Sequence, residues 1–163
     1  MKKLSFKFLF WLSFGIYLSS CILSFLIILI SNLNLGDLTF NNYIGTWFDI
    51  FIHNLKINFI IILGGAFFSI PSIFLLVGNG LIVGTIIGES IIQNNFLNIL
   101  FSIGPHGIVE IPTFIYAGAV SFEITKEILI NKFHINKSFF VNIGYKMLLC
   151  SIFTLIAAII EGL

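Results

Sequence analysis

The chain has 163 residues, of which 58% are hydrophobic and only 9% charged, and its net charge is +1. A soluble domain carries about 25% charged residues, and its interior could not enclose so many apolar side chains. Neither the net charge nor any basic run points to a nucleic-acid partner. The composition therefore predicts an all-α integral membrane protein, a single polytopic domain over residues 1–163.

Residues 8–30 are predicted to form the first span, because 23 residues of helix reach roughly 34 Å. The lysines before this run also suit a signal peptide, and Leu18–Cys21 imitates a lipoprotein cleavage box. The apolar run continues for nine residues beyond Cys21, however, which favours an uncleaved span.

Residues 46–58 are amphipathic when placed on a helix. Thr46, Asp49, His53 and Lys56 form one polar stripe, and Trp47 lies among the apolar residues around it. One interpretation is a helix lying in the membrane interface, and the other is the polar beginning of a long second span.

Four further apolar runs give predicted spans at 59–77, 81–101, 108–124 and 140–160, which makes five. Lysines gather before the first span and between the fourth and the fifth, whereas the loop after the first span has none. By the positive-inside rule both lysine groups lie on the cytoplasmic side, which five spans allow. We expect a multi-pass protein of a bacterial cytoplasmic membrane with a cytoplasmic N-terminus. Whether residues 94–106 span or re-enter is left open.

The third predicted span begins with Gly80, Gly84 and Gly88, which form one row on a helix. Such a row usually lets a neighbouring backbone approach closely, and it can also clear space for a substrate. Glu89 follows this row and is expected near the bilayer midplane, where an ionisable group needs a partner or a purpose.

Glu123 and Lys146 both fall toward the cytoplasmic ends of adjacent predicted spans. We expect them to form a structural ion pair, with extension of the Lys146 side chain to the interface as the alternative.

A second group of ionisable residues is predicted at the outer side. His106 and Glu110 are four residues apart, so a helix places them on one face, and Asp49, His53 and Glu161 fall at the same depth. Imidazole and carboxylate groups can share a proton or bind a metal. His106, Glu110 and Glu161 are therefore the catalytic candidates, and zinc at His106 and Glu110 is the one cofactor considered. The alternative is that all five are ordinary interfacial residues.

Six short motifs follow one another in a fixed order. They are His53–Lys56, Gly64–Gly65, Asn79–Gly80 with Gly84, the run Pro105-His106-Gly107-Ile108-Val109-Glu110, Ala117–Ala119 and Ala157–Glu161. In this order and spacing they resemble the stage II sporulation protein M family, over about two-thirds of the chain. The PHGxxE element is the most specific. The resemblance places the family's polar motif on Asn54, Asn79, His106, Glu110 and Glu161.

The resemblance implies one of two roles. In endospore formers, the protein would position partner proteins that remodel septal peptidoglycan during engulfment. In gene clusters for circular bacteriocins, a short member would help a small hydrophobic peptide lose its leader, become cyclic or leave the cell. This chain has short loops and little surface for large cell-wall enzymes, which favours the second role.

We therefore expect a membrane component for the maturation and export of a small hydrophobic circular bacteriocin-type peptide. Its expected partners are the peptide precursor and a separate ATPase subunit of a transporter, because the chain has no phosphate-binding loop of its own. An intramembrane peptidase or cyclase that uses the His/Glu site is the enzymatic version of this hypothesis. A non-enzymatic scaffold for septal cell-wall enzymes is the alternative.

Overall fold

The computed structural model describes residues 4–32, 46–131 and 136–161, without the side chains of residues 98–106 and 161. Within these ranges the chain forms helices and no strand. The helices are α1 (Phe6–Ser31), α2 (Trp47–Leu63), the 3-10 helix η1 (Gly64–Phe67), α3 (Ile70–Ile92), α4 (Phe96–Asn131) and α5 (Lys137–Glu161).

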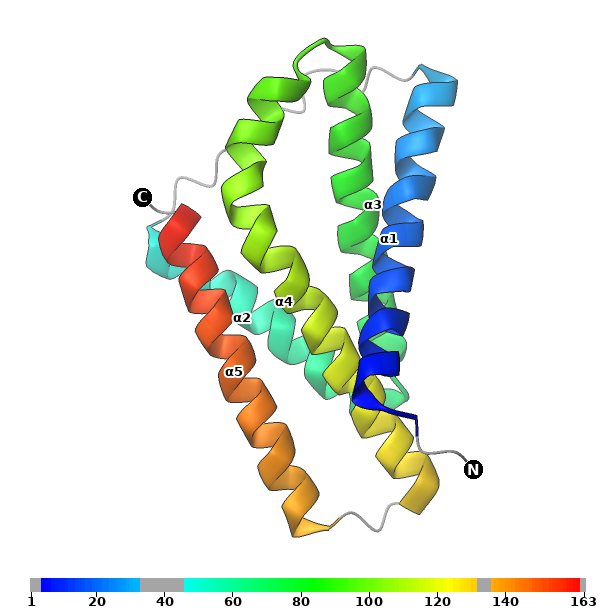
Figure 1. Ribbon diagram of the computed structural model, residues 1–163, viewed down its shortest axis with the longest axis vertical. Coiled ribbons are helices and arrows are strands. Elements are labelled where there is room, and N and C mark those ends of the chain that lie inside the picture. The colour runs from blue at the N-terminus through cyan, green and yellow to red at the C-terminus, as the bar shows by residue number, and fades with distance from the viewer. Residues whose placement is uncertain (1–3, 33–45, 132–135, 162–163) are drawn as a thin grey trace.

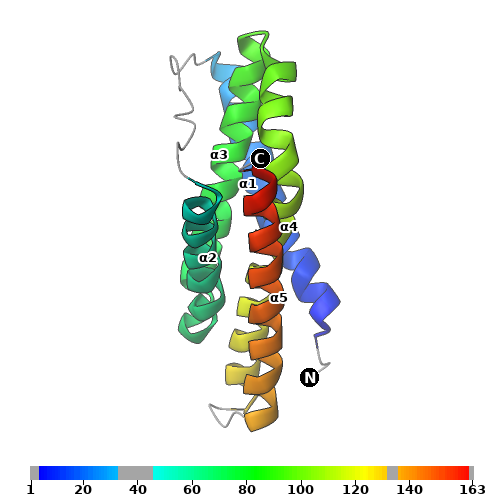
Figure 2. The ribbon, with the colours of Figure 1, turned by 90° about the vertical axis from the view of Figure 1, so that its left-hand side faces the viewer.

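Successive α-helices run in alternating directions (Figure 1): α1, α3 and α5 run one way, and α2 and α4 run the other. Helices α1 and α3 are parallel neighbours. Helix α4 crosses the centre of the bundle and contacts each of the other helices. Figure 2 shows that α2 and α5 accompany only the lower part of the bundle. Helix α4 is therefore the element around which the others are arranged.

Five segments are long and apolar enough to cross a membrane. They are Phe6–Ser31, Trp47–Phe67, Ile70–Ile92, Gly107–Asn131 and Lys137–Ile160. The prediction of an all-α membrane protein with about five spans is confirmed by this finding.

The second and third spans lie earlier in the sequence than the predicted 59–77 and 81–101. Residues 46–58 are not a separate interfacial helix but belong to α2, in agreement with the alternative of a long second span. A turn lies inside the predicted 59–77 span, where Phe68 and Ser69 both adopt positive φ, at 56° and 58°. Because most residues on both sides of this turn are apolar, a prediction from hydropathy alone does not detect it. Helix α4 then runs without a break from Phe96 to Asn131, and the candidate span within it is Gly107–Asn131.

The turn between α2 and α3 is held against α4 by a hydroxyl cluster of Ser69, Ser72, Ser121 and Thr125. Ser69 Oγ lies 2.9 Å from Ser121 Oγ and 2.7 Å from Thr125 Oγ1, and Ser72 Oγ lies 2.6 Å from Ser121 Oγ. Two of these hydroxyls also donate to backbone carbonyls where α2 changes into η1, those of Ile61 and Gly65. Side-chain hydroxyls thus satisfy backbone groups that a helix break leaves open within the membrane protein.

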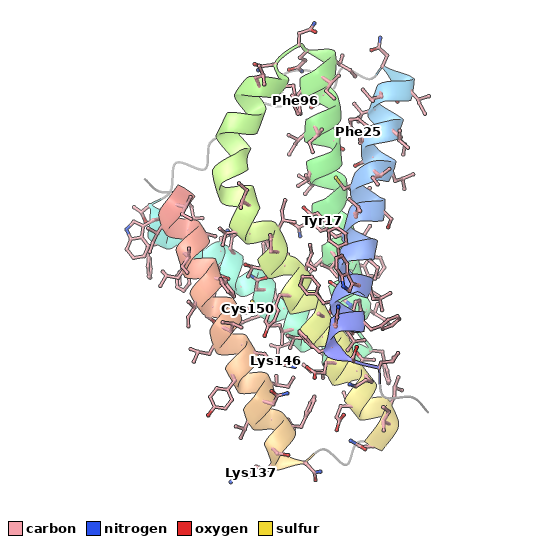
Figure 3. All side chains as sticks on the ribbon, in the orientation of Figure 1. Tyr17, Phe25, Phe96, Lys137, Lys146 and Cys150 are labelled. Carbon is pink, nitrogen blue, oxygen red and sulfur yellow. The ribbon has the colours of Figure 1, made fainter. Side chains whose placement is uncertain are left out.

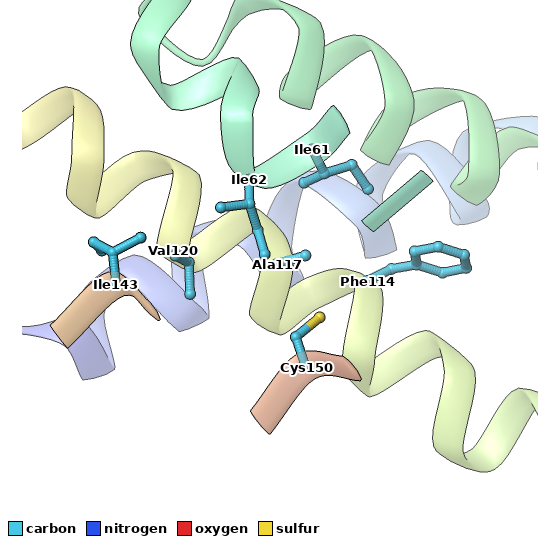
Figure 4. Packing of buried hydrophobic residues seen from close by; sticks show 7 residues of the cluster. All are labelled: Ile61, Ile62, Phe114, Ala117, Val120, Ile143 and Cys150. Atoms are coloured by element: carbon cyan, nitrogen blue, oxygen red, sulfur yellow. The ribbon is translucent and has the colours of Figure 1, made fainter. Parts of the chain in front are cut away.

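The apolar core lies where α2, α4 and α5 meet (Figure 4). It consists of Ile61 and Ile62 from α2, Phe114, Ala117 and Val120 from α4, and Ile143 and Cys150 from α5. The Cys150 thiol is fully buried and Cys21 is half-buried, and neither forms a disulfide. Both cysteines therefore act as small apolar side chains.

Helices α1 and α3 lie close together because small residues face one another along both. The row Gly80, Gly84 and Gly88 faces α1. A Cβ atom on Gly84 would collide with the carbonyl oxygen of Cys21 and with the hydroxyl of Ser24. The structure thus agrees with the packing interpretation of the glycine row.

Replacing Gly84 by alanine should destabilise the protein by about 1–3 kcal/mol, because the methyl group would force α1 away from α3. Gly78→Ala is the matched control, since a Cβ on this glycine of the same helix meets nothing within 4 Å. That control should leave stability unchanged or raise it by up to about 1 kcal/mol, owing to the better helix propensity of alanine. Unfolding in mixed detergent micelles, followed by circular dichroism, measures both; equal effects would contradict the close approach.

Candidate functional site

The predicted catalytic residues share one level along α4 and α5. Lys146 of α5 forms an ion pair with Glu123 of α4, and the two helices are antiparallel. Both rise about 1.5 Å per residue, so Glu161, fifteen residues after Lys146, is level with the part of α4 that carries His106 and Glu110. The side chains of His106 and Glu161 lie outside the described part of the chain, and only their backbone level is established.

Helix α2 brings its own polar residues to the same level. Asn58 Nδ2 donates a hydrogen bond of 3.0 Å to Thr154 Oγ1, which fixes the antiparallel register of α2 and α5. Asp49 and His53 precede Asn58 by nine and five residues, and Glu161 follows Thr154 by seven. The start of α2 therefore lies beside the end of α5, as Figures 1 and 2 show.

Asp49 has a structural task at this level. Its Oδ2 atom accepts hydrogen bonds from the backbone N–H of Thr46 at 2.9 Å and from the Thr46 hydroxyl at 2.8 Å. The Thr46 hydroxyl in turn accepts from the Asp49 N–H, which completes a capping box at the start of α2. Among its neighbours on α2, His53 is exposed and Asn54 is buried.

Glu110 is half-buried on α4 and interacts electrostatically with the buried Tyr17 of α1. Figure 3 shows Tyr17 near the middle of the bundle, where α1 passes α4. Glu110 lies one helical turn after His106 on α4.

Glu89 and Asn79 both lie on α3, which begins at Ile70 and therefore earlier than the predicted span at 81–101. Glu89 is buried, at 6% exposed, and lies in the last turn of α3 rather than at the middle of a span. Because α3 begins at Ile70 and not near Leu81, Glu89 lies near the end of the candidate span, and its depth in the membrane stays a prediction. Asn79 donates to the carbonyl oxygen of Leu75 within its own helix, at 2.8 Å.

The predicted ion pair between Glu123 and Lys146 is confirmed. Lys146 Nζ also lies 4.0 Å from the centroid of the Phe6 ring, a cation–π contact. Lys126 Nζ donates to the carbonyl oxygen of Leu4 at 3.3 Å. These contacts tie the beginning of α1 to α4 and α5 and form a polar layer at the lysine-rich end.

An apolar groove of about 360 Å³ runs between α1 and α5, with α4 as its floor. Its lining residues are Phe10 from α1, Ile108, Val109, Pro112, Thr113 and Tyr116 from α4, and Phe153 from α5. Ile108 and Phe153 are exposed, so the groove opens to the side of the molecule. In the described part of the chain α1 and α5 meet through Phe6 and Lys146, and the groove lies farther along both helices, between Phe10 and Phe153.

Among the residues whose side chains are described, no three His, Cys, Asp or Glu residues group as metal ligands would. A zinc site at His106 and Glu110 stays a prediction, because the His106 side chain is outside the described part.

Sequence reasoning did not identify the Asn58–Thr154 pair, the hydroxyl cluster or the small-residue face of α1. The last had a visible signal, since Ser13, Ser20 and Ser24 recur at helical spacing and face the neighbouring helices. The hydroxyl cluster had none, because its members come from two segments about fifty residues apart in the sequence.

The fold and the site define a multi-pass α-helical membrane protein with a lateral apolar groove and two polar levels. The sequence model of the family described as Stage II sporulation protein M matches residues 4–163. The chain belongs to this family, which confirms the resemblance over nearly its whole length. Searches of curated proteins and of solved structures give no match.

Replacing Thr154 by valine should destabilise the protein by about 1–3 kcal/mol, because the fully buried Asn58 amide would lose its hydrogen-bond acceptor. Ser151→Ala is the control, since Ser151 bonds only within α5, and it should change stability by less than about 0.5 kcal/mol. Adding Asn58→Leu to Thr154→Val should recover part of the loss. Detergent unfolding measures all three, and a neutral Thr154→Val variant would contradict the assigned role of the pair.

Cysteines placed at His106 and Glu161 should be joined by a short bifunctional thiol reagent, because the α4–α5 register puts both backbones at one level. The background is the chain with Cys21 and Cys150 replaced by alanine. A Glu89/Glu161 cysteine pair is the control and should stay unjoined, since α3 and α5 are not in contact. A mobility shift on gels measures the linkage, and linkage of the control pair alone would refute the register.

Proposed function

We propose that the chain is the membrane component that helps a small hydrophobic peptide of the circular-bacteriocin type lose its leader, become cyclic and leave the cell. The observation that carries this proposal is the lateral groove between α1 and α5, which is apolar and open to the side. Lipid tails are as apolar as the helix itself, so an apolar helix enters a protein groove only when it packs more closely there than in lipid. The groove offers such a surface to a peptide already dissolved in the bilayer.

The chemistry proposed for the maturation step uses the polar level at the upper end of this groove. Glu110 is adjacent in sequence to Val109, which lines the groove. In the enzymatic version, His106 acts as a base or metal ligand, and Glu110 and Glu161 act as base or co-ligands, with zinc as the candidate metal. In the non-enzymatic version, the same residues bind the peptide's polar ends.

The proposed orientation places the N-terminus in the cytoplasm of a bacterium. Lys7, Lys126 and Lys137 begin or end their helices at the same end of the bundle, and Figure 3 shows Lys137 at its tip. Lysines favour the cytoplasmic side of a membrane protein. The peptide would then arrive from the cytoplasm, and a separate ATPase subunit would supply the energy of export.

A scaffold for septal peptidoglycan-remodelling enzymes in endospore engulfment is the second candidate, supported by the description of the family itself. On that hypothesis the protein binds cell-wall enzymes and no small peptide. A host that forms no spores would exclude it.

A photoreactive phenylalanine analogue at Phe153, within the groove, should crosslink to the peptide precursor in cells. The same analogue at Phe74 is the control, because that side chain is 73% exposed on α3 and is not part of the groove. Mass spectrometry of the crosslinked product measures the contact. Deleting the gene should abolish mature circular peptide, and undiminished product or equal crosslinking at both positions would overturn the proposal.

The enzymatic version requires purified protein to cleave or cyclise a synthetic precursor. His106→Ala should abolish this conversion, whereas His134→Ala, outside the predicted site, should leave it intact. Full peptide maturation in cells carrying His106→Ala would refute the catalytic role and leave only the binding role.

A further inference from the structure

The outer face of α2 carries exposed residues that are alternately four and three positions apart. They are Asp49, His53, Lys56, Ile60, Leu63 and Phe67, the last of which belongs to η1. This spacing is the one by which the side chains of one helix fit against a second helix. Figure 2 shows α2 at one edge of the bundle, and the residues that line the apolar groove come from α1, α4 and α5. The outer face of α2 is therefore a surface separate from the groove.

Lys56 lies at half the height of the molecule. Asn58 is bonded to Thr154, which is eight residues beyond Lys146 on α5. Lys56 precedes Asn58 by two residues on the antiparallel α2, so it lies about 15 Å farther from the lysine-rich end than Lys146. Lys146 pairs with Glu123 of α4, and ten residues before Glu123 is the middle of that 36-residue helix.

This height places Lys56 within the hydrocarbon. Helix α4 is about 54 Å long, and the hydrocarbon core of a bilayer is about 30 Å thick. A layer of this thickness that α4 crosses contains the middle of α4 wherever it lies along the helix. The segment Trp47–Phe67, which carries Lys56, is itself long and apolar enough to cross a membrane. Lys56 is thus an exposed ammonium group at membrane depth.

The ammonium group of Lys56 needs a counter-charge at this depth. No acidic side chain in the described part of the chain pairs with it. A charged group in hydrocarbon is costly, and such groups pair with an opposite charge or line a polar path. On one side of Lys56 the outer face is polar, with Asp49 and His53, and on the other side it is apolar. The face therefore fits a second helix that is apolar along one half and carries an acidic group near its middle.

A second copy of the chain does not supply this acidic group through the same face. A two-fold axis along the membrane normal places equal helices side by side and parallel, so Lys56 would face Lys56 and Asp49 would face Asp49. Like charges would meet at both positions. The other carboxylates with described side chains are buried or half-buried in the bundle: Glu89, Glu110, Glu123 and Glu127.

We infer that the outer face of α2 binds a membrane helix of a different protein, which carries a carboxylate level with Lys56. The carboxylate neutralises the ammonium group through a charge-assisted hydrogen bond. The apolar residues of the partner helix pack against Ile60, Leu63 and Phe67, which are 52%, 57% and 68% exposed. This inference concerns a partner protein and holds whether or not a peptide is the substrate of the groove.

The test uses the full-length protein in phosphatidylcholine vesicles, with Trp11 replaced by phenylalanine so that Trp47 at the start of α2 is the one tryptophan. The probe is a synthetic helix of about 20 leucine and alanine residues with one aspartate at its middle and a dansyl group at one end. The same helix with asparagine at that position is the matched probe. Energy transfer from Trp47 to the dansyl group measures binding.

The aspartate helix should bind about tenfold more tightly than the asparagine helix, because only the carboxylate neutralises Lys56. Lys56→Met should abolish this preference. Lys7→Met is the control, because it removes an exposed lysine near the start of α1, and it should keep the preference. Equal binding of both helices, or a preference that survives Lys56→Met, would overturn the inference. Lys56→Gln replaces Lys56→Met if that variant does not fold.

Two further measurements distinguish the partner helix from other occupants of the face. Energy transfer between donor-labelled and acceptor-labelled copies of the protein, if lost in Lys56→Met, would show that the face joins two copies. Loss of the aspartate preference when phosphatidylglycerol is added to the vesicles would show that a lipid phosphate occupies it. Either result would contradict a protein partner, whereas a preference that persists through both measurements supports one.

Discussion

The structure depends on how closely helix backbones approach one another through small residues. Lipid tails are as apolar as leucine, so helices in a bilayer associate through packing and hydrogen bonds rather than by escape from water. Gly118 on the central α4 lies against Ser13 of α1 and Leu76 of α3, where a Cβ would collide with both side chains. Gly65 of η1 lies against the backbone of Ser121, at 2.5 Å from its carbonyl oxygen for an added Cβ. At each such contact a larger side chain would separate the helices and open the bundle.

Most of the fold was accessible from the sequence, and the missing part has a physical reason. Hydropathy and helix length predict five spans, because a membrane core imposes both requirements on every crossing segment. The turn at Phe68 and Ser69 had local signals that the hydropathy prediction did not use, since Gly64 and Gly65 precede it and Pro71 lies in the first turn of α3. The α4 hydroxyls that satisfy the turn had no such signal. Ser121 lies 52 residues away from Ser69, so no local pattern could reveal it. The different bounds of the second and third spans, and the place of Glu89 in the last turn of α3, follow from this one missed turn.

Two of the acidic residues, Asp49 and Glu123, have structural roles that the described contacts identify. Asp49 caps α2, and Glu123 neutralises Lys146 where α1 begins, so the charge of each is needed for structure. Charge alone therefore did not distinguish a site residue from a structural one in the sequence. Glu110 is half-buried on α4, and the side chain of Glu161 lies outside the described part of the chain. Their common level on α4 and α5 depends on the antiparallel register, which the sequence could suggest only through an assumed topology.

The lateral groove depends on how α1 and α5 are arranged on α4. Phe6 of α1 lies against Lys146 of α5, and the groove floor between the two helices belongs to α4, where Pro112 is exposed and Thr113 is buried. The same ion-pair layer that ties α1 to α5 at one end also places the polar ends of α2, α4 and α5 about 20 Å away. Glu110 lies in the part of α4 that forms the groove floor, and Glu123 lies thirteen residues further along the same helix.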